Sequence, residues 1–231
     1  MIDYQYSYLV GTIFYLIVWV ILFWHRKDLQ REMLVMSFLI GLMGLATNYY
    51  WWNVDWWHPP HITNTPVGIE DFLIGFASGG AIAVIYEEIL KKRYYKSHVR
   101  RHVPGVKIIL LLLAQLTFWL LWGLHLTSFV GSSIAMLTTA SVMFYYRKDL
   151  FWKGFLTALL TPLISLVFYY PIIFSVPNWV NQTYRFNYLS GRLVLGIPIE
   201  ELIFWFFAGL VFGPLYEYWQ GIRLVSMRVR R

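Results

Sequence analysis

The chain has no cysteine and few charged residues. Without cysteine it can form no disulfide, no thiolate nucleophile and no cysteine metal site. Charged residues make up only 13% of the 231 positions, whereas hydrophobic residues make up 58%. A water-soluble domain of this length could not bury so much apolar surface, so the composition indicates a membrane protein.

Several motifs of familiar enzyme classes are also missing. No Gly-x-Gly-x-x-Gly segment follows a predicted strand and no Walker lysine motif is present, which counts against a Rossmann-bound flavin or nicotinamide and against a P-loop nucleotide site. No aspartate-rich pair suited to magnesium diphosphate is present, which counts against a prenyltransferase. The last apolar run has no lysine, so the sequence does not favour a retinal Schiff base.

Apolar runs of about twenty residues dominate the sequence, and this length spans the hydrocarbon core of a bilayer. We therefore expect an all-α integral membrane fold with seven transmembrane helices in a single domain, residues 1–231. The first run has no preceding Lys or Arg, and His25, Arg26 and Lys27 follow it, so we expect a permanent helix rather than a signal peptide. The predicted spans are 6–24, 33–52, 67–90, 106–124, 127–146, 152–176 and 196–219.

The basic residues predict the orientation of the chain. With seven spans, only Arg185 and Arg192 fall on one side, and the other Lys and Arg residues fall on the opposite side. The positive-inside rule then places the N-terminus outside and the C-terminus in the cytoplasm. The basic loops can contact anionic lipid headgroups, but they have no folded domain that would present them to nucleic acid, so we expect no such partner. The clustered basic residues are Arg26, Lys27, Arg31, Lys91, Lys92, Arg93, Lys96, Arg100, Arg101, Lys107, Arg147, Lys148, Lys153, Arg223, Arg228, Arg230 and Arg231.

Two pairs of acidic residues open the third and the seventh apolar runs. Glu70 and Asp71 form the first pair, and Glu200 and Glu201 form the second, 130 positions later. Carboxylates near a membrane interior are costly and by default mark function. Acidic residues at helix N-termini can also act by complementing the helix macrodipole. We favour catalysis, because the dipole alone does not require a duplicated pair beside a fully apolar helix.

A second pair of similar segments indicates that the internal duplication extends beyond the acidic pairs. Residues 23–29 (FWHRKDL) resemble residues 144–150 (FYYRKDL), with an offset of 121. We therefore predict two three-helix repeats, 6–90 and 127–219, joined by a linking helix at 106–124. The extra crossing makes the repeats parallel and relates them by a pseudo-twofold axis along the membrane normal. Both acidic pairs then lie at the same depth.

The two acidic pairs form one site only if the third and seventh helices pack together. Small residues favour such close approach. Adjacent helical positions point about 100° apart, so one carboxyl of each pair can face a cavity while the other faces a neighbouring element. The small residues along the two helices are Gly75, Ser78, Gly79, Gly80, Gly209 and Gly213.

The other polar and aromatic residues in or near the spans are more typical of structural roles than of chemistry. Tyr-Glu pairs end both helices, at Glu87 and Glu217, and we interpret them as interfacial anchors with surface ion pairs rather than as a second functional layer. Asn48 is expected near the depth of Glu70. Gln115, His125 and Asn48 are otherwise typical of helix-to-helix hydrogen bonds. Trp51, Trp52, Trp56 and Trp57 are expected in an interfacial aromatic belt.

A metal site is conceivable at Asp55, His58 and His61, which have suitable ligand types. Their spacing crosses Pro59 and Pro60, which forbid a regular helix, and the second repeat has no counterpart. We therefore expect an exposed loop and no metal.

The second acidic motif carries a family resemblance. Pro198-x-Glu200-Glu201, followed by the aromatic run at 204–207, resembles the small membrane lycopene cyclases, which occur as two-subunit bacterial enzymes and as fused archaeal and fungal forms. Gly68 and Asp71 depart from the motif in the first copy. In this family each copy supplies three helices, and fused forms add a linking helix.

The resemblance implies a carotenoid end-group cyclase that requires no flavin or other cofactor. An acyclic isoprenoid end of lycopene or a related carotenoid is protonated, the cation closes to a ring of the β type, and a proton is lost. The predicted catalytic residues are Glu70, Asp71, Glu200 and Glu201, and aromatic faces would stabilise the cation. The alternative is a small transporter or lipid-binding protein that uses the same acids as a proton relay. The predicted substrate-binding residues are Asn48, Phe72, Phe76, Phe204, Trp205 and Phe206.

Overall fold

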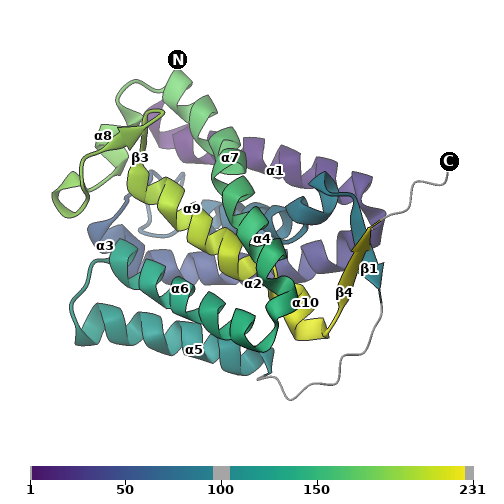
Figure 1. Ribbon diagram of the computed structural model, residues 1–231. Helices are drawn as coiled ribbons and strands as arrows, with labels where there is room; N and C mark the ends of the chain where they lie inside the picture. Colours follow the sequence, from purple (N-terminus) through teal and green to yellow (C-terminus); the bar gives the residue numbers. More distant parts are fainter. Residues whose placement is uncertain (1, 96–104, 227–231) are drawn as a thin grey trace.

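Seven long helical segments form the bundle in the computed structural model, which describes residues 2–95 and 105–226 (Figure 1). Each segment is long and apolar enough to cross a membrane. The predicted all-α, multi-pass membrane fold is therefore confirmed, with bounds within a few residues of the predicted spans. The long helices are α1 (Ser7–His25), α2 (Gln30–Thr47), α4 (Ile69–Ile89), α5 (Val106–Phe118), α6 (Ser128–Tyr146), α7 (Phe151–Ser175) and α9 (Ile199–Phe212).

Short elements connect or extend these helices. Two π-helical turns, η3 (Asn48–Trp52) and η4 (Trp119–Gly123), continue α2 and α5, and such turns are frequent at functional sites. Pro214 lacks the backbone donor of a helix interior and separates α9 from α10 (Leu215–Gln220). The other short elements are α3 (Asn53–Asp55), α8 (Trp179–Thr183), the 3₁₀ turns Tyr4–Tyr6, Lys27–Leu29, Lys148–Leu150 and Phe186–Tyr188, and the strands β1 (Lys92–Tyr95), β2 (Leu193–Val194), β3 (Ile197–Pro198) and β4 (Arg223–Ser226).

The helices α4 and α9 lie at the centre of the bundle and contact each other. Glycines let each approach a neighbour closely. A Cβ atom on Gly75 of α4 would lie 2.7 Å from the Ile40 carbonyl oxygen of α2, and one on Gly209 of α9 would lie 2.8 Å from Ala158 Cα of α7. These side-chain-free positions permit backbone-to-backbone packing of the kind that joins helices in membranes.

Strands β1 and β4 follow the two central segments and pair antiparallel at one end of the bundle (Figure 1). Tyr94 is paired with Leu224, and these residues differ by 130 in number. A twofold axis through the two-stranded sheet of β1 and β4 would pair each residue at its centre with the residue 130 positions later. The two-repeat architecture itself stays a prediction.

Basic residues at this end do not all occupy exposed loops. Arg26 and Arg147 are 4% and 2% exposed, and each binds the aspartate two positions later at 2.8–2.9 Å. Lys153, which we grouped with the basic residues between the fifth and sixth spans, lies within α7 and is buried. The basic residues Lys96, Arg100, Arg101, Arg228, Arg230 and Arg231 lie outside the described residues.

Lys153 belongs to a buried ionic cluster that corrects a prediction. Its ammonium binds Glu217 and lies 2.7 Å from Glu87 Oε1 and 3.6 Å from Glu32 Oε1. Glu87 and Glu217 are fully buried, so the interpretation as surface anchors is wrong. The four side chains come from α2, α4, α7 and α10, and the amphipathic lysine joins them because it reaches from α7 between the other helices.

Candidate active site

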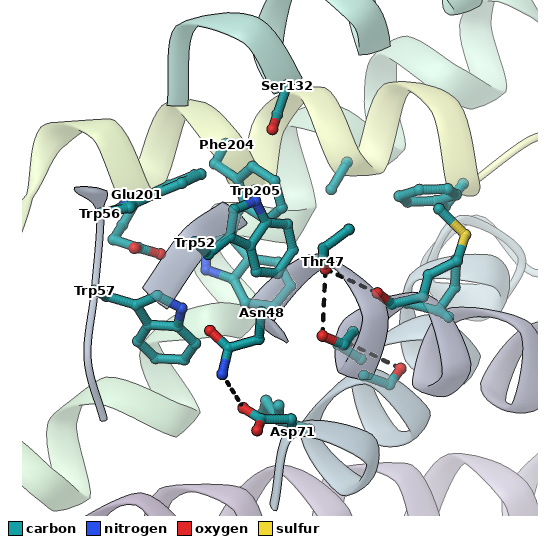
Figure 2. A pocket seen from close by; sticks show the side chains of 18 of the residues that line it. Thr47, Asn48, Trp52, Trp56, Trp57, Asp71, Ser132, Glu201, Phe204 and Trp205 are labelled. Atoms are coloured by element: carbon teal, nitrogen blue, oxygen red, sulfur yellow. Dashed lines mark hydrogen bonds between the residues drawn. The ribbon is translucent and has the colours of Figure 1, made fainter. Parts of the chain in front are cut away.

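A largely apolar cavity lies between α4 and α9 and contains about 1060 Å³ of space free of protein atoms, counting the part open to the surroundings. Asp71 and Glu201 both line it, one from each central helix (Figure 2). Its lining residues are Tyr8, Ile40, Met43, Gly44, Thr47, Asn48, Trp52, Trp56, Trp57, Asp71, Ile74, Gly75, Ser78, Ile82, Leu113, Thr117, Ser132, Met136, Phe168, Tyr169, Glu201, Phe204, Trp205, Ala208 and Phe212.

The two central helices line the cavity with corresponding positions. From α4 these are Asp71, Ile74, Gly75, Ser78 and Ile82. Each of the five α9 residues in the lining lies 130 positions later in the chain. The spacing follows one face of a helix, so the cavity continues along both helices below the carboxylates.

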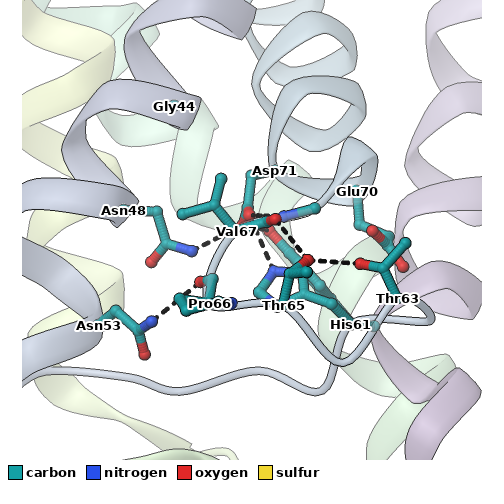
Figure 3. A network of polar contacts seen from close by, with 12 residues as sticks. Gly44, Asn48, Asn53, His61, Thr63, Thr65, Pro66, Val67, Glu70 and Asp71 are labelled. Atoms are coloured by element: carbon teal, nitrogen blue, oxygen red, sulfur yellow. Dashed lines mark hydrogen bonds and ion pairs between the residues drawn. The ribbon is translucent and has the colours of Figure 1, made fainter.

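Four groups surround the carboxylate of Asp71, and Figure 3 shows two of them, the side chains of Asn48 and His61. Its Oδ1 accepts hydrogen bonds from Tyr8 Oη and from Asn48 Nδ2, both at 2.9 Å. Its Oδ2 accepts from the Gly68 backbone N–H at 2.9 Å and lies 2.8 Å from His61 Nε2. Asp71 is only 2% exposed, so these groups replace water around a buried carboxylate and stabilise its charge.

His61 is buried beside Asp71, which corrects the prediction of an exposed histidine loop. Burial disfavours the imidazolium, but the interaction with Asp71 and the charge of Glu70 outweigh that effect and raise the pKa of His61. His58 is exposed and its ring nitrogen contacts Asn53 instead. Burial and the nearby charge of Arg185 lower the pKa of His58.

The three possible metal ligands do not converge. Asp55 Oδ2 accepts a hydrogen bond of 2.8 Å from the backbone N–H of Ser128, at the start of α6. It therefore caps a helix, as expected for a carboxylate at an N-terminus. Among the described residues, no three His, Cys, Asp or Glu side chains are arranged so that they could hold a metal ion.

Glu201 has a different environment from Asp71. It is 6% exposed, and its Oε2 accepts a hydrogen bond of 2.6 Å from Tyr169 Oη. The indole N–H of Trp205 donates to the same tyrosine oxygen at 3.0 Å, which fixes the hydroxyl so that its hydrogen points to Glu201. Tyr184 and Trp56 are further side-chain partners of Glu201, and all three partners are neutral, so a negative charge on Glu201 has no counterpart of the His61 imidazole beside Asp71.

Glu70 and Glu200 are buried but are not among the residues that line the cavity. Each binds a loop at the same end of the bundle. Glu70 Oε1 accepts from the Ile62 backbone N–H at 2.8 Å, and Glu200 Oε1 accepts from the Ser190 backbone N–H at 2.6 Å. The outer member of each pair therefore holds a loop over the site, while the inner member faces the cavity.

Aromatic residues are distributed unequally over the two main walls. The α9 wall carries Phe204 and Trp205, whereas the corresponding α4 positions are Ile74 and Gly75. Trp52 and Trp56 pack edge-on against Phe204, with centroids 5.1 and 5.0 Å away. Of the two central helices, α9 is therefore the one that presents aromatic rings to the cavity.

The tryptophans also correct a prediction. Trp56 is only 2% exposed and lines the cavity with Trp52 and Trp57, so the interpretation as an aromatic belt is wrong for Trp56. The π turn η3 follows α2 directly, and it places Asn48 and Trp52 on the cavity side four residues apart.

The predicted substrate-binding residues are only partly brought together. Asn48, Phe204 and Trp205 line the cavity. Phe72 and Phe76 pack instead near Phe38, with ring centroids 6.3 and 5.2 Å away, and Phe206 stacks edge-on against its neighbour Phe207. Phe72, Phe76 and Phe206 do not line the cavity. Gln115 and His125 are exposed rather than buried between helices.

Sequence reasoning missed Tyr8, Tyr169 and the role of His61. A signal for Tyr169 was available, because it lies 121 positions after Asn48, the offset that relates residues 23–29 to 144–150. Both side chains donate to the cavity carboxylate of their own half. Tyr8 and His61 had no comparable signal, since the resemblance of the two halves does not extend to them.

Together these features define a multi-pass membrane protein with two carboxyl groups facing one apolar, aromatic-walled cavity. Comparison with protein-family models matches residues 5–89 and 127–219 to the family described as "Lycopene cyclase". The chain therefore belongs to the lycopene cyclase family, and the general function is that of a carotenoid cyclase. The matched segments leave out α5. No curated protein and no solved structure gives a significant match.

Proposed function

We propose that this protein cyclises an acyclic carotenoid end group, as in lycopene, to a β-type ring inside the cavity between α4 and α9. The observation that carries the proposal is the placement of Asp71 and Glu201 on the same apolar cavity. Protonation of an alkene needs an acid in a site that excludes water, because water would intercept the carbocation. The family match supports cyclisation over the transporter alternative.

Glu201 is the proposed proton donor, because its carboxyl lines the cavity beside Phe204 and Trp205 and has only neutral side chains as hydrogen-bond partners. The O–H bond of Glu201 breaks as a C–H bond forms on the terminal alkene. The tertiary cation is attacked by the neighbouring double bond, which closes the six-membered ring. Loss of a ring proton to the Glu201 carboxylate then restores both the acid and a neutral product.

Asp71 is the proposed fixed counter-ion. Tyr8, Asn48, the Gly68 backbone N–H and the His61 imidazole surround its two oxygens and stabilise a negative charge there. A preorganised negative charge stabilises a developing cation without reorganising during the reaction. The faces of Phe204 and Trp205 add cation–π attraction, worth about 0.5–2 kcal/mol for each well-placed ring.

The steps balance without a redox partner. One proton enters the substrate and one leaves it, so substrate and product are isomers. The reaction as written needs no flavin and no metal.

The experiment is conversion of lycopene by the detergent-purified protein, followed by pigment chromatography. We expect an isomeric product with a ring at one or both ends. Lycopene that is returned unchanged by correctly folded protein would contradict the proposal.

Glu201→Gln keeps the side-chain volume and removes the transferable proton. We expect turnover to fall by at least about 100-fold, the usual scale for a lost general acid. Glu200→Gln is the matched control, because Glu200 binds the Ser190 loop and does not line the cavity. Comparable losses in both variants would refute the separate roles.

A further inference from the structure

The cavity does not lie symmetrically in the bundle. On one flank α1 packs closely against α7. On the other flank the corresponding helices, α6 and α2, make no comparable contact among the described residues, and α5 packs on the outside of α6 (Figure 1). Cavity residues on this second flank come from α2, α5 and α6. The cavity therefore extends towards the seam between α2 and α5.

The cavity is also a slot rather than a pocket around the carboxylates. Ile82 and Phe212 line its far end, and each lies eleven residues beyond the carboxylate on its helix. At 1.5 Å per residue the slot runs about 16 Å towards the middle of the membrane. An extended polyene with a ring-forming end at Glu201 would exceed this length.

Both ends of the slot are blocked for an apolar chain. At the outer end Trp56 packs against Phe129 of α6, with ring centroids 5.5 Å apart. At the inner end the buried Lys153 cluster follows, since Glu87 and Glu217 lie five residues beyond Ile82 and Phe212. Desolvated charges do not accommodate hydrocarbon, so the remaining length of the chain must leave sideways.

The linking helix α5 forms the wall at this sideways exit. Leu113 and Thr117 line the slot and are 5% and 9% exposed, whereas Leu111 on the same helix is 59% exposed. Across the seam, Gly44 and Thr47 of α2 line the slot while remaining partly exposed. Small and partly accessible side chains on one side of a seam leave room for a thin hydrocarbon chain.

We propose that α5 is a substrate-binding element: the polyene tail of the substrate lies against Leu113 and Thr117 and leaves the protein into the bilayer between α2 and α5. This inference rests on the proposed function, because it places the ring-forming end at Glu201. It assigns a role to the segment that lies outside the family match. The ligand is a linear, apolar isoprenoid chain that enters from the membrane.

The first test compares two leucine-to-tryptophan variants on the same helix. Leu113→Trp narrows the slot, and Leu111→Trp adds the same bulk on the lipid side. We expect Leu113→Trp to lower kcat/KM for a full-length acyclic carotenoid by at least tenfold. A truncated substrate that ends within the slot should lose less than threefold, and Leu111→Trp should resemble wild type. Equal effects on both substrates, or equal effects of both variants, would overturn the inference while leaving the cyclase function standing.

The second test needs no catalysis and uses the absence of cysteine from the chain. Single variants Leu113→Cys and Leu111→Cys are treated in lipid vesicles with a membrane-soluble N-alkyl maleimide, with and without lycopene. We expect both to be labelled and lycopene to slow labelling at least threefold at position 113 alone. If Leu113→Cys is not labelled, or if lycopene does not slow its labelling, the inference that the polyene tail leaves between α2 and α5 is wrong. If wild type converts no carotenoid but the protection is seen, the proposed function fails and the tail site stands.

Discussion

Asp71 and Glu201 correspond in position but differ in the groups that bind them. Asp71 has Tyr8, Asn48, Gly68 and the imidazole of His61 around its two oxygens, whereas the side chains at Glu201, Tyr169, Tyr184 and Trp56, are all neutral. Donors favour the charged form of a carboxyl group. The difference in partners therefore supports the proposed division of a pair of like groups into a fixed anion and a proton carrier, as in other enzymes that use two carboxyl groups.

His61→Gln tests the link between His61 and Asp71 through the pH dependence of stability. The pKa of His61 is raised in the folded protein, so its contribution is complete below the unfolded value, about 6.5, and is lost as the pH rises through the folded pKa. We expect wild type to exceed the variant in thermal unfolding midpoint at about pH 6, with the difference shrinking towards about pH 9. Circular dichroism in detergent measures this.

His58→Gln is the control for this experiment. The pKa of His58 is lowered, so the sign is opposite and its difference from wild type should not shrink as the pH rises. A pH-independent difference for His61→Gln would contradict an ion pair between His61 and Asp71.

At the residue scale, the sequence predicted the acidic positions but not their partners. The offset of 130 makes the acidic positions recognisable in the sequence, because both acidic residues of the first pair have an acidic counterpart in the second. His61 reaches Asp71 only because the loop that carries Pro59 and Pro60 folds back onto the start of α4. Such a return depends on the three-dimensional path of a loop, which leaves no periodic pattern in the sequence.

At the scale of elements, Lys153 joins four helices at the end opposite the active site. The cluster draws on both halves, since Glu32 and Lys153 differ by 121 positions and Glu87 and Glu217 differ by 130. These are the two offsets of the predicted duplication, so a search along both offsets could have found it. Hydropathy alone could not have found the cluster, because a buried lysine near the start of a helix has the same sequence pattern as a lysine at the membrane interface.

Lys153→Met should strongly destabilise the fold. Removing the ammonium leaves three buried carboxyl groups without their partner, and breaking a buried ion pair costs about 3–5 kcal/mol. Thermal unfolding in detergent measures the loss.

Lys148→Met is the control, because Lys148 is exposed and lies five residues before Lys153. Adding Glu217→Gln to Lys153→Met should recover part of the stability, as expected for coupled neighbours. Full additivity of the two changes would show that the cluster does not act as a unit.

At the scale of the whole molecule, hydropathy was sufficient for the seven spans because helix formation in a bilayer depends on local length and composition. The packing of the helices against one another was harder to predict from the sequence. Packing of α1 on α7, without an equivalent contact between α2 and α6, depends on side-chain fit across distant segments. The asymmetry of the cavity could not be expected from two similar halves.

The basic residues predict the orientation of the chain, since only Arg185 and Arg192 lie on the predicted outer side. We expect a C-terminal fluorescent fusion to be bright and a C-terminal alkaline phosphatase fusion to be inactive, because the C-terminus would face the cytoplasm. A phosphatase that is active at the C-terminus would reverse the orientation and place the active site near the cytoplasmic face.

The single aromatic wall has a stereochemical consequence. With Phe204 and Trp205 on α9 and the non-aromatic Ile74 and Gly75 at the corresponding positions of α4, we expect an end group to present one face to the acid. The carbon that receives the proton becomes a prochiral methylene. Product formed in heavy water should therefore carry its deuterium in one configuration at that carbon, as nuclear magnetic resonance can show. Equal amounts of the two configurations would mean that the end group turns freely between the walls.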